Sequence, residues 1–363
     1  MSKSLFRSLM SNIIKITRKK SSGIGRPTAN KMEPRYDYNR QWTLQPKLAT
    51  KPLFTFKLIS YNILAQDLLM QHLYLYMNRP EELLTWRHRL QKLQREIIKL
   101  DPDILCLQEM QYDHLAMLVQ RLTANSGKRL EYVYKKKTGN RTDGCAIIYD
   151  ATKFKLISQH GVELYDMNVP LLDRENVALL AKFRLKQSSR DRNAKESQEV
   201  VVATTHLLFN PRRSDVRCAQ VTKLLNELHI FAANSSKDCS SDSNKKQSLP
   251  DSYTTPVILT GDFNSEIDTP PMTLIRSKGT DDSSLNFKLL NPGDYTASTY
   301  QHEWITVDYI MHSDCPRSKQ KLDVLSVYLL PKIHSCANAG YIPNHYLGSD
   351  HYSLGAVFAL VPK

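Results

Sequence analysis

The sequence predicts an α/β fold in which two β-sheets pack face to face and helices cover the outer faces. Short apolar runs typical of strands recur along the chain and outnumber the segments with helical spacing, which indicates stacked sheets with a few helices outside. The chain has 363 residues, of which 41% are hydrophobic and 24% charged, as in globular proteins. A chain of this size can bury a large core, and two-sheet folds often exceed roughly 250 residues as one domain.

The individual strands are predicted where short apolar runs end in turn residues. They are expected at 54–62, 104–107, 144–149, 177–185, 199–205, 256–260, 305–311 and 353–360. Helices are expected at 81–100 and 215–231, because apolar residues recur there every three or four positions. Asp101-Pro102 ends the first helix, since a proline disfavours the helical conformation in the residue before it.

The N-terminal segment differs from the rest of the chain. Residues 1–50 are predicted to be a basic, disordered tail and linker, and residues 51–363 the folded domain. The tail holds eleven Lys and Arg residues against Glu33 and Asp37, so it carries most of the net charge of +14. That charge is therefore weak evidence for a nucleic-acid surface on the domain. Residues 1–32 contain no acid and place apolar side chains at helical spacing, which is typical of a mitochondrial targeting segment; a disordered basic tail is the alternative.

Three further features concern the environment of the protein. No apolar run approaches the roughly 18 residues of a membrane span. The six cysteines lack the spacing of a zinc site, which indicates reduced, mostly buried thiols. We therefore expect an intracellular protein, cytoplasmic unless residues 1–32 direct it to mitochondria. Ser, Lys, Asp and Asn dominate 234–255, which predicts a flexible, exposed insertion.

Polar residues suited to metal and phosphate chemistry stand at the ends of several predicted strands. Asn62 interrupts an apolar run, where a turn or cap is the more common use of Asn. Glu109 follows a buried strand and fits a solvated strand end or a Mg²⁺ ligand equally well. His206 also follows a strand, and a hydrogen-bonded structural histidine is its common alternative. Asp262 and Asn264 are two apart, so they point the same way if the backbone is extended; an Asx turn is the alternative.

Asp308 and His351 complete this set. A carboxylate inside an apolar strand, as at Asp308, is costly unless it is paired. His351 is a natural partner, because a carboxylate bonded to one ring nitrogen fixes the tautomer and leaves the other nitrogen facing substrate. For Asp350-His351 taken alone, a polar loop pair is the alternative.

In this order, the motifs resemble those of the endonuclease/exonuclease/phosphatase superfamily, over about residues 54–361. The motifs are Asn62, Gln108-Glu109, Thr205-His206, Gly261-Asp262-Phe263-Asn264, Asp308-Tyr309 and Ser349-Asp350-His351. The resemblance implies a four-layer, DNase I-like sandwich of two mostly antiparallel sheets, with the site where strand ends from both sheets converge. It also implies a Mg²⁺-dependent phosphoesterase, in which Mn²⁺ can replace Mg²⁺.

The resemblance further implies a role for each residue near the metal and the attacking water. Glu109 is the main Mg²⁺ ligand, and Asn62 helps to hold the metal or the phosphate. Asp262 orients or deprotonates the water, and Asn264 binds a phosphate oxygen.

The histidines are implied to act on the phosphorus itself. His206 and His351 stabilise the pentacovalent phosphorus, and Asp308 orients His351. Whether His351 acts as a base or as a charge stabiliser stays open.

Segments 60–66 and 205–211 are similar to the deadenylase and nocturnin branch of the superfamily and, more closely, to its angel proteins. Angel proteins are associated with removal of 2′,3′-cyclic phosphate from RNA 3′ ends. We expect that reaction, with a poly(A)-directed 3′ exoribonuclease as the alternative. A non-catalytic relative that binds RNA or a translation factor is the third interpretation. RNA is the expected partner, and no protein partner is predicted.

Substrate contacts are expected from Asn210, Arg217, Trp304 and Asp350. Asn210, Arg217 and Trp304 lie in segments that are similar to angel proteins, and Asp350 belongs to the last motif. An aromatic side chain near the site can stack on a base, although a core role for Trp304 is the alternative.

Overall fold

The computed structural model divides the chain into two units, of which the second is compact and comprises Tyr36–Lys363. The described residues are 38–44, 50–186, 198–233, 255–277, 285–314 and 318–363. The predicted targeting segment lies outside them, as does the predicted insertion apart from Thr255. Part of the predicted linker belongs to the compact unit, because Trp42 forms a β-bridge with Tyr328.

One six-stranded sheet has the order β13-β14-β1-β2-β4-β3. Its strands are β1 (Phe54–Asn62), β2 (Ile104–Gln111), β3 (Leu130–Lys136), β4 (Asp143–Asp150), β13 (Gln320–Tyr328) and β14 (Leu354–Pro362). Only β1 and β2 pair in parallel among them, and the other pairs are antiparallel. We call this sheet the first sheet.

The second sheet also has six strands, in the order β5-β6-β7-β8-β12-β9. They are β5 (Phe154–Glu163), β6 (Val177–Leu185), β7 (Glu199–His206), β8 (Val257–Asp262), β9 (Asn286–Leu289) and β12 (Asp308–Asp314). Only β7 and β8 are parallel among them. A separate hairpin consists of β10 (Thr299–Gln301) and β11 (Glu303–Ile305).

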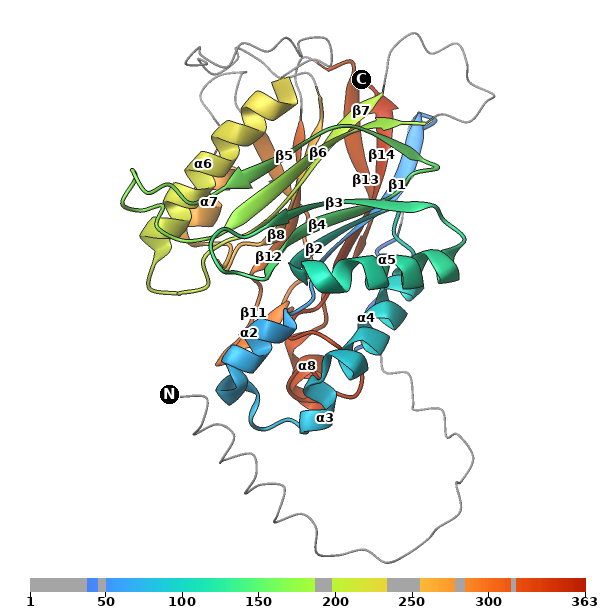
Figure 1. Cartoon of the computed structure of the whole chain (residues 1–363). Coiled ribbons are helices and arrows are strands. Elements are labelled where there is room, and N and C mark those ends of the chain that lie inside the picture. Colours follow the sequence, from blue (N-terminus) through green and yellow to red (C-terminus); the bar gives the residue numbers. More distant parts are fainter. Residues whose placement is uncertain (1–37, 45–49, 187–197, 234–254, 278–284, 315–317) are drawn as a thin grey trace, which may run out of the picture. The chain divides into compact units, whose positions relative to one another are not determined.

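Helices lie on the outer sides of the two sheets (Figure 1). Those of the first sheet are α4 (Trp86–Leu100) and α5 (Tyr112–Ser126), and those of the second are α6 (Ser214–Ala233) and α7 (Pro270–Arg276). Shorter helices are α2 (Gln66–Gln71), η1 (Leu73–Tyr76), α3 (Glu81–Leu84) and α8 (Ile333–Ala339). None of the helices in the described part of the chain combines the length and the hydropathy that a membrane crossing requires.

Alternation along the strands builds separate apolar layers. Leu58 of β1 belongs to the core between the sheets, together with Leu179 of β6 and Val202 of β7. The next residue, Ile59, points to the other side and packs with Leu93 of α4. Since successive strand side chains face opposite ways, β1 contributes to two layers at once, which makes the predicted four-layer α/β sandwich. The predicted fold class is confirmed.

Several predicted elements have different bounds. The predicted strand 104–107 extends to Gln111, so Glu109 lies inside β2 and not after it. The predicted helix 81–100 is two helices, because Thr85 is extended between α3 and α4. The predicted strand 305–311 is wrong at its start: β12 begins at Asp308, and Val307 lies before it. Asp308 is therefore the first residue of its strand and not a residue inside an apolar run.

Candidate active site

A row of three polar side chains crosses the second sheet at one end. In register, His206 at the end of β7 lies beside Asp262 at the end of β8. Asp262 in turn lies beside Asp308 at the start of β12. Gly261 is required next to this row: its φ is 144°, and an added Cβ would come within 2.1 Å of the Thr205 carbonyl oxygen.

Two further polar side chains come from the first sheet. Asn62 ends β1 and is paired in parallel with Gln108 of β2. Glu109 follows at an irregularity of the β2–β4 pairing and has a left-handed backbone, with φ of 56°. A bulge of this kind turns a side chain away from the regular pleat, which explains how a residue inside β2 reaches the strand ends.

The two groups meet through the amide of Asn62. Its Nδ2 donates to Glu109 Oε1 and to Asp262 Oδ2, in both cases at 3.0 Å. The carboxylates of Glu109 and Asp262 are therefore neighbours, as the sequence predicts, although they belong to different sheets. The Asn62 Oδ1 accepts the backbone N–H of Leu64 at 3.1 Å. An NH₂ group that faces two carboxylates cannot ligate a cation, so this geometry favours an orienting role for Asn62.

His351 approaches the row from the loop before β14. Its Nδ1 donates to Asp308 Oδ2 at 2.8 Å, and its Nε2 lies 3.7 Å from Asp262 Oδ2. The Ser349 hydroxyl fixes the loop, because it donates to the Asn62 carbonyl oxygen at 2.6 Å and accepts the His351 N–H at 3.1 Å. The predicted pairing of Asp308 with His351 is thus present.

Burial changes the acid strength of the carboxylates. Burial raises the pKa of Asp262 to about 7, and Asp308 adds to this increase while His351 opposes it. Burial and the nearby charge of Asp350 also raise the pKa of Glu109. Both carboxyl groups are therefore harder to ionise than in water, and a cation bound beside them would favour their charged forms.

The two histidines differ in charge near neutral pH: the His351 ring is positively charged and the His206 ring is neutral. Burial alone lowers the pKa of His351, but the charges of Asp308 and Asp262 outweigh it and hold that pKa well above its ordinary value. For His206, burial comes first, and the positive charges of Lys137 and His351 add to it, so its pKa lies well below the ordinary value. One charged and one neutral imidazole therefore face the same space.

The residues around Glu109 fit a divalent cation. Its Oε1 accepts from Asn62 and its Oε2 from the Ala65 N–H at 2.9 Å, and each oxygen keeps acceptor capacity. Asp350 Oδ1 is buried and has no hydrogen-bond partner among the described groups. Buried carboxylate oxygens with free lone pairs are the ligands that hard cations prefer.

A second possible metal group consists of Asp262, Asp308 and His351, whose ligand atoms lie within 4.8 Å of one another. Two of these ligand atoms, His351 Nδ1 and Asp308 Oδ2, are already hydrogen-bonded to each other. The oxygens of Glu109 and Asp350 therefore have more free acceptor capacity for a cation than this second group.

Asn264 lies beyond the end of β8, and its backbone is not extended. Its φ is 46°, and its N–H donates to Asp262 Oδ1 at 2.9 Å, which is an Asx turn. Its Nδ2 donates to the carbonyl oxygen of Leu207 at 3.0 Å. The turn that the sequence leaves open as an alternative is present, and it holds the buried Asn264 beside the row.

Two of the predicted substrate contacts follow β7: Asn210 lies in the loop after it, and Arg217 lies near the start of α6. Asn210 is exposed at that loop. Arg217 is buried, and its guanidinium donates to Ser265 Oγ at 3.0 Å and to the carbonyl oxygens of Leu208, Asn210 and Pro211. These bonds favour a role for Arg217 in positioning the loop over direct contact with substrate.

The other two candidates lie near His351. Trp304 is half-buried, packs against the core between the sheets and meets the Tyr300 ring edge-on at 5.2 Å. Asp350 accepts the Tyr76 hydroxyl through Oδ2 at 2.6 Å. The charge of Asp350 acts on both Glu109 and His351, so Asp350 lies near the cluster. Trp304 is partly in the core and partly exposed to solvent.

Sequence reasoning missed two buried cations. Lys137 lies beyond β3 and pairs with Asp143 at 2.7 Å, with side chains 9% and 1% exposed. Arg89 of α4 is fully buried and donates to the carbonyl oxygens of Ile63, Leu64 and Gly348. Lys137 stands in a run of lysines, and Arg89 stands on a charged helix, so neither differs in sequence from a solvated residue.

Replacing Arg89 with Met is expected to lower the free energy of unfolding by about 3 kcal/mol. The change leaves buried carbonyl oxygens without donors, and hydrogen bonds to charged groups are worth about 1.5–3 kcal/mol each. Urea unfolding measures this loss. Arg87→Met, at an exposed position of the same helix, is the matched control, and equal stability of both variants would contradict the assignment.

The chain matches the model of the endonuclease/exonuclease/phosphatase family over residues 59–351. It is 51% identical to Protein angel of Drosophila melanogaster, over 94% of this chain and 93% of that protein. Protein angel homolog 2 of Danio rerio is 38% identical, over 63% of this chain and 36% of that longer protein.

Solved structures give the same relationship. A crystal structure of ANGEL2, described as a 2′,3′-cyclic phosphatase in complex with adenosine-2′,3′-vanadate, has a TM-score of 0.69 and 27% identity, over 88% of this chain and 98% of that chain. The human nocturnin catalytic domain has the same fold, with a TM-score of 0.61 and 24% identity, over 92% of this chain and 100% of that chain. The chain therefore belongs to the endonuclease/exonuclease/phosphatase family and, within it, to the angel proteins.

Proposed function

We propose that this protein is a Mg²⁺-dependent phosphoesterase that hydrolyses 2′,3′-cyclic phosphate at RNA 3′ ends. The observation that carries the proposal is the shared Asn62 amide, which brings the carboxylates of Glu109 and Asp262 together beside His351. This arrangement offers one side to a metal ion and the other to a phosphate. The similarity to ANGEL2, which was solved with adenosine-2′,3′-vanadate, supports a cyclic phosphate as the substrate.

The proposed metal side is Glu109 with the free Oδ1 of Asp350. A bound Mg²⁺ supplies a Lewis acid that polarises the phosphoryl oxygen and neutralises developing charge. Asn62 keeps the carboxylates of Glu109 and Asp262 in place by its two hydrogen bonds. Mn²⁺ is expected to replace Mg²⁺, since it accepts the same oxygen ligands.

Proton transfer is assigned to Asp262. A carboxylate whose pKa is about 7 is suited to accept a proton from water near neutral pH. The water oxygen forms a bond to phosphorus, and the bond from phosphorus to the ribose 2′ or 3′ oxygen breaks in line with it. The leaving oxygen takes up a proton, so the ring opens to a monoester without other reactants.

We assign to the histidines and to Asn264 the stabilisation of negative charge on the phosphoryl oxygens. His351, charged and fixed by Asp308, stabilises the negative charge that develops at phosphorus. His206, whose pKa lies well below its ordinary value, is neutral and can donate one ring N–H to a phosphoryl oxygen. Asn264 is held beside them by its bond to the Leu207 carbonyl.

The purified protein is expected to open the cyclic phosphate of a short RNA while leaving the 3′-hydroxyl A-tail of a matched RNA intact. The physical reason is that ring opening needs only the terminal phosphate at the cluster, whereas tail shortening also needs the next nucleotide in line. Both RNAs are incubated with Mg²⁺, and their products are separated by gel electrophoresis and mass.

EDTA provides the control, since removal of the divalent ion is expected to stop turnover and Mg²⁺ or Mn²⁺ to restore it. Shortening of the A-tail with an intact cyclic end would identify the deadenylase alternative instead. RNA binding without turnover of either substrate in Mg²⁺ would favour the non-catalytic interpretation.

A further inference from the structure

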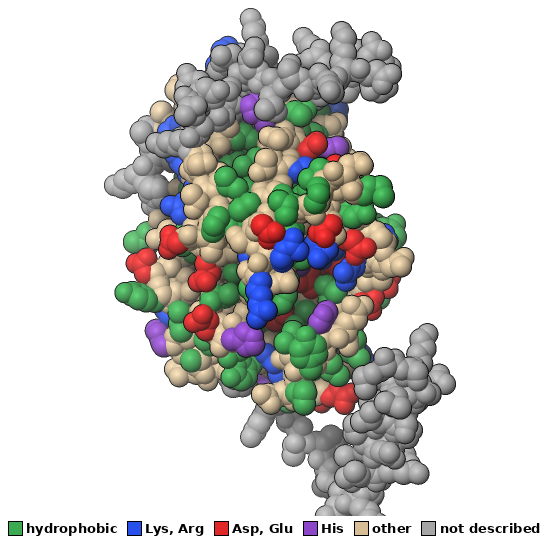
Figure 2. Space-filling model, turned by 90° about the vertical axis from the view of Figure 1, so that its left-hand side faces the viewer, with side chains coloured by type: hydrophobic (Ala, Val, Ile, Leu, Met, Phe, Trp, Pro, Cys, Tyr) green, Lys and Arg blue, Asp and Glu red, His purple; other side chains and the backbone are tan. Residues whose placement is uncertain are grey.

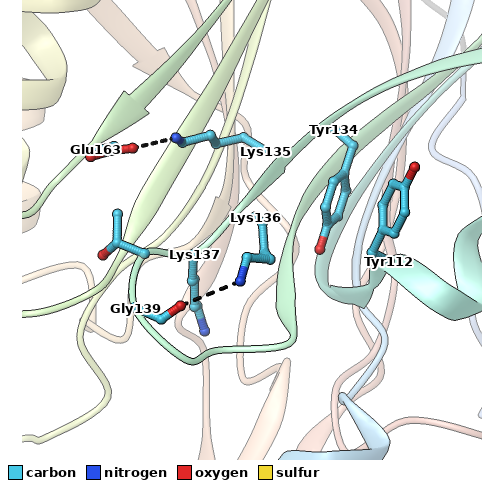
Figure 3. A pocket seen from close by; sticks show the side chains of 8 residues that line it. Tyr112, Tyr134, Lys135, Lys136, Lys137, Gly139 and Glu163 are labelled. Carbon is cyan, nitrogen blue, oxygen red and sulfur yellow. Dashed lines mark hydrogen bonds and ion pairs between the residues drawn. The ribbon is translucent and has the colours of Figure 1, made fainter.

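A surface cavity of about 630 Å³ lies between the end of β3 and the start of α5 (Figure 3). Its lining includes Tyr112, Tyr134, Lys135, Lys136, Lys137 and Glu163. We call it the Tyr112 pocket. None of its residues belongs to the catalytic cluster described above. On the face shown in Figure 2, Lys and Arg side chains gather next to acidic side chains around a hollowed area.

Two tyrosines form one wall of the Tyr112 pocket. Their ring centroids are 5.4 Å apart, and Figure 3 shows the two rings next to each other. The Tyr134 hydroxyl donates to the carbonyl oxygen of Met110 at 3.0 Å, which holds that ring in place. Tyr112 is 62% exposed, so the held ring supports a second aromatic face that is open to a ligand.

Lys136 supplies positive charge that is not paired with a carboxylate of any described residue. Its Nζ donates to the backbone carbonyl oxygens of Gly139 and Arg141, at 3.4 and 3.0 Å. The part of the chain that the structure describes gives Lys136 no ion pair, whereas Lys135 pairs with Glu163 at 2.6 Å. An exposed ammonium group next to an exposed aromatic ring is suited to a phosphate and its base.

The Tyr112 pocket adjoins the catalytic cluster. Met110, which accepts the Tyr134 hydroxyl, directly follows Glu109 in β2. Lys137 lines the pocket, and its positive charge also acts on both Glu109 and His206. Its side chain therefore lies close to both sites. A strand whose 3′ end reaches Glu109 can continue across this wall.

We propose that the Tyr112 pocket binds the single-stranded RNA that precedes the 3′ terminus, with Tyr112 stacked on a base and Lys136 in contact with a backbone phosphate. This inference rests on the proposed function, because it assumes an RNA end at the catalytic cluster. Base–aromatic stacking is largely independent of sequence, so the pocket distinguishes long substrates from mononucleotides and does not read a sequence.

Lys136→Glu and Tyr112→Ala are each expected to weaken binding of a single-stranded RNA of about 12 nucleotides by about tenfold. Fluorescence anisotropy in EDTA measures this without cleavage. Lys136→Glu is also expected to reduce the salt dependence of binding, because one phosphate contact is lost. Matched controls are Lys155→Glu on β5 and Tyr295→Ala, both at exposed positions outside the pocket. The melting temperatures of all four variants identify any unfolded protein.

The kinetic arm compares the same RNA ending in cyclic phosphate with adenosine 2′,3′-cyclic phosphate alone. The pocket variants are expected to raise KM for the RNA about tenfold and to leave KM and kcat for the mononucleotide unchanged. Equal effects on both substrates, or RNA binding within twofold of wild type, would overturn the inference. Equally strong competition by an acidic peptide would also overturn it.

The two proposals fail separately. If wild-type protein turns over neither substrate but RNA binding still depends on Tyr112 and Lys136, the proposed reaction is wrong and the binding pocket stands. If wild type opens the cyclic phosphate and the variants bind RNA normally, only the pocket is wrong.

Discussion

Asp262→Asn is expected to lower kcat by about 10⁴-fold while the protein stays folded. The amide cannot accept the proton of the attacking water, and loss of a general base costs roughly 10²–10⁴-fold. The upper end applies here, because Asp262 also accepts hydrogen bonds from Asn62 and Asn264 that align it. Steady-state kinetics with the RNA cyclic phosphate measure the change.

The same substitution has two opposing effects on stability. It removes a buried charge whose pKa is raised to about 7, and it loses one hydrogen bond, because an amide has a single acceptor oxygen. We expect the free energy of unfolding at pH 8 to stay within about 2 kcal/mol of wild type. Since a raised carboxyl pKa costs stability above that pKa and nothing below the unfolded value, the variant is least favoured at acidic pH.

Asp268→Asn is the matched control for this prediction, because Asp268 is an exposed acid in the loop that follows Asp262. It is expected to retain full kcat. Turnover by Asp262→Asn at more than a tenth of the wild-type rate would remove Asp262 from the proton-transfer role. Loss of folding by that variant would instead show that the carboxylate is required for structure.

The sequence predicts the central strands of both sheets but not their edges. Strands β1 and β6 are rich in apolar residues because most of their positions on both faces are buried, and their predicted bounds match the structure. The missed strands β3, β5, β9 and β13 are the edge strands of the two sheets. Only one of the seven β3 residues and two of the ten β5 residues are buried, so polar residues interrupt the apolar pattern that identifies a strand.

The geometry of the candidate site is likewise only partly predictable from the sequence. Strand ends are visible in the sequence, and the parallel register brings His206 beside Asp262 as expected for such ends. The bulge that turns Glu109 inward is not visible, because it depends on how β2 pairs with β4. The buried pair of Lys137 and Asp143 also depends on a hairpin that closes only in the folded protein.

Asp308→Asn is the second substitution for which we expect a large effect, a fall in kcat of about 10²–10³-fold. Asp308 holds the pKa of His351 well above its ordinary value, so the wild-type imidazole is charged near neutral pH. With an amide at position 308, burial is opposed only by the remaining acids, so the pKa of His351 is expected to fall and its charged fraction to decrease. NMR of the imidazole nitrogens in metal-free protein measures this change directly, and Asp323→Asn on the edge strand β13 is the control.

The charge of His351 also determines how stability changes with pH. A histidine with a raised pKa contributes stability that is fully present below the unfolded value, near 6.5, and is lost as the pH rises through the folded value. The stability difference between wild type and Asp308→Asn is therefore expected to be largest at pH 6 and to shrink under alkaline conditions. Urea unfolding of both proteins at pH 6 and at an alkaline pH measures this stability difference. A difference that grows with pH would mean that His351 is neutral in the wild type, and the charge-stabilising role would then pass to the metal and to His206.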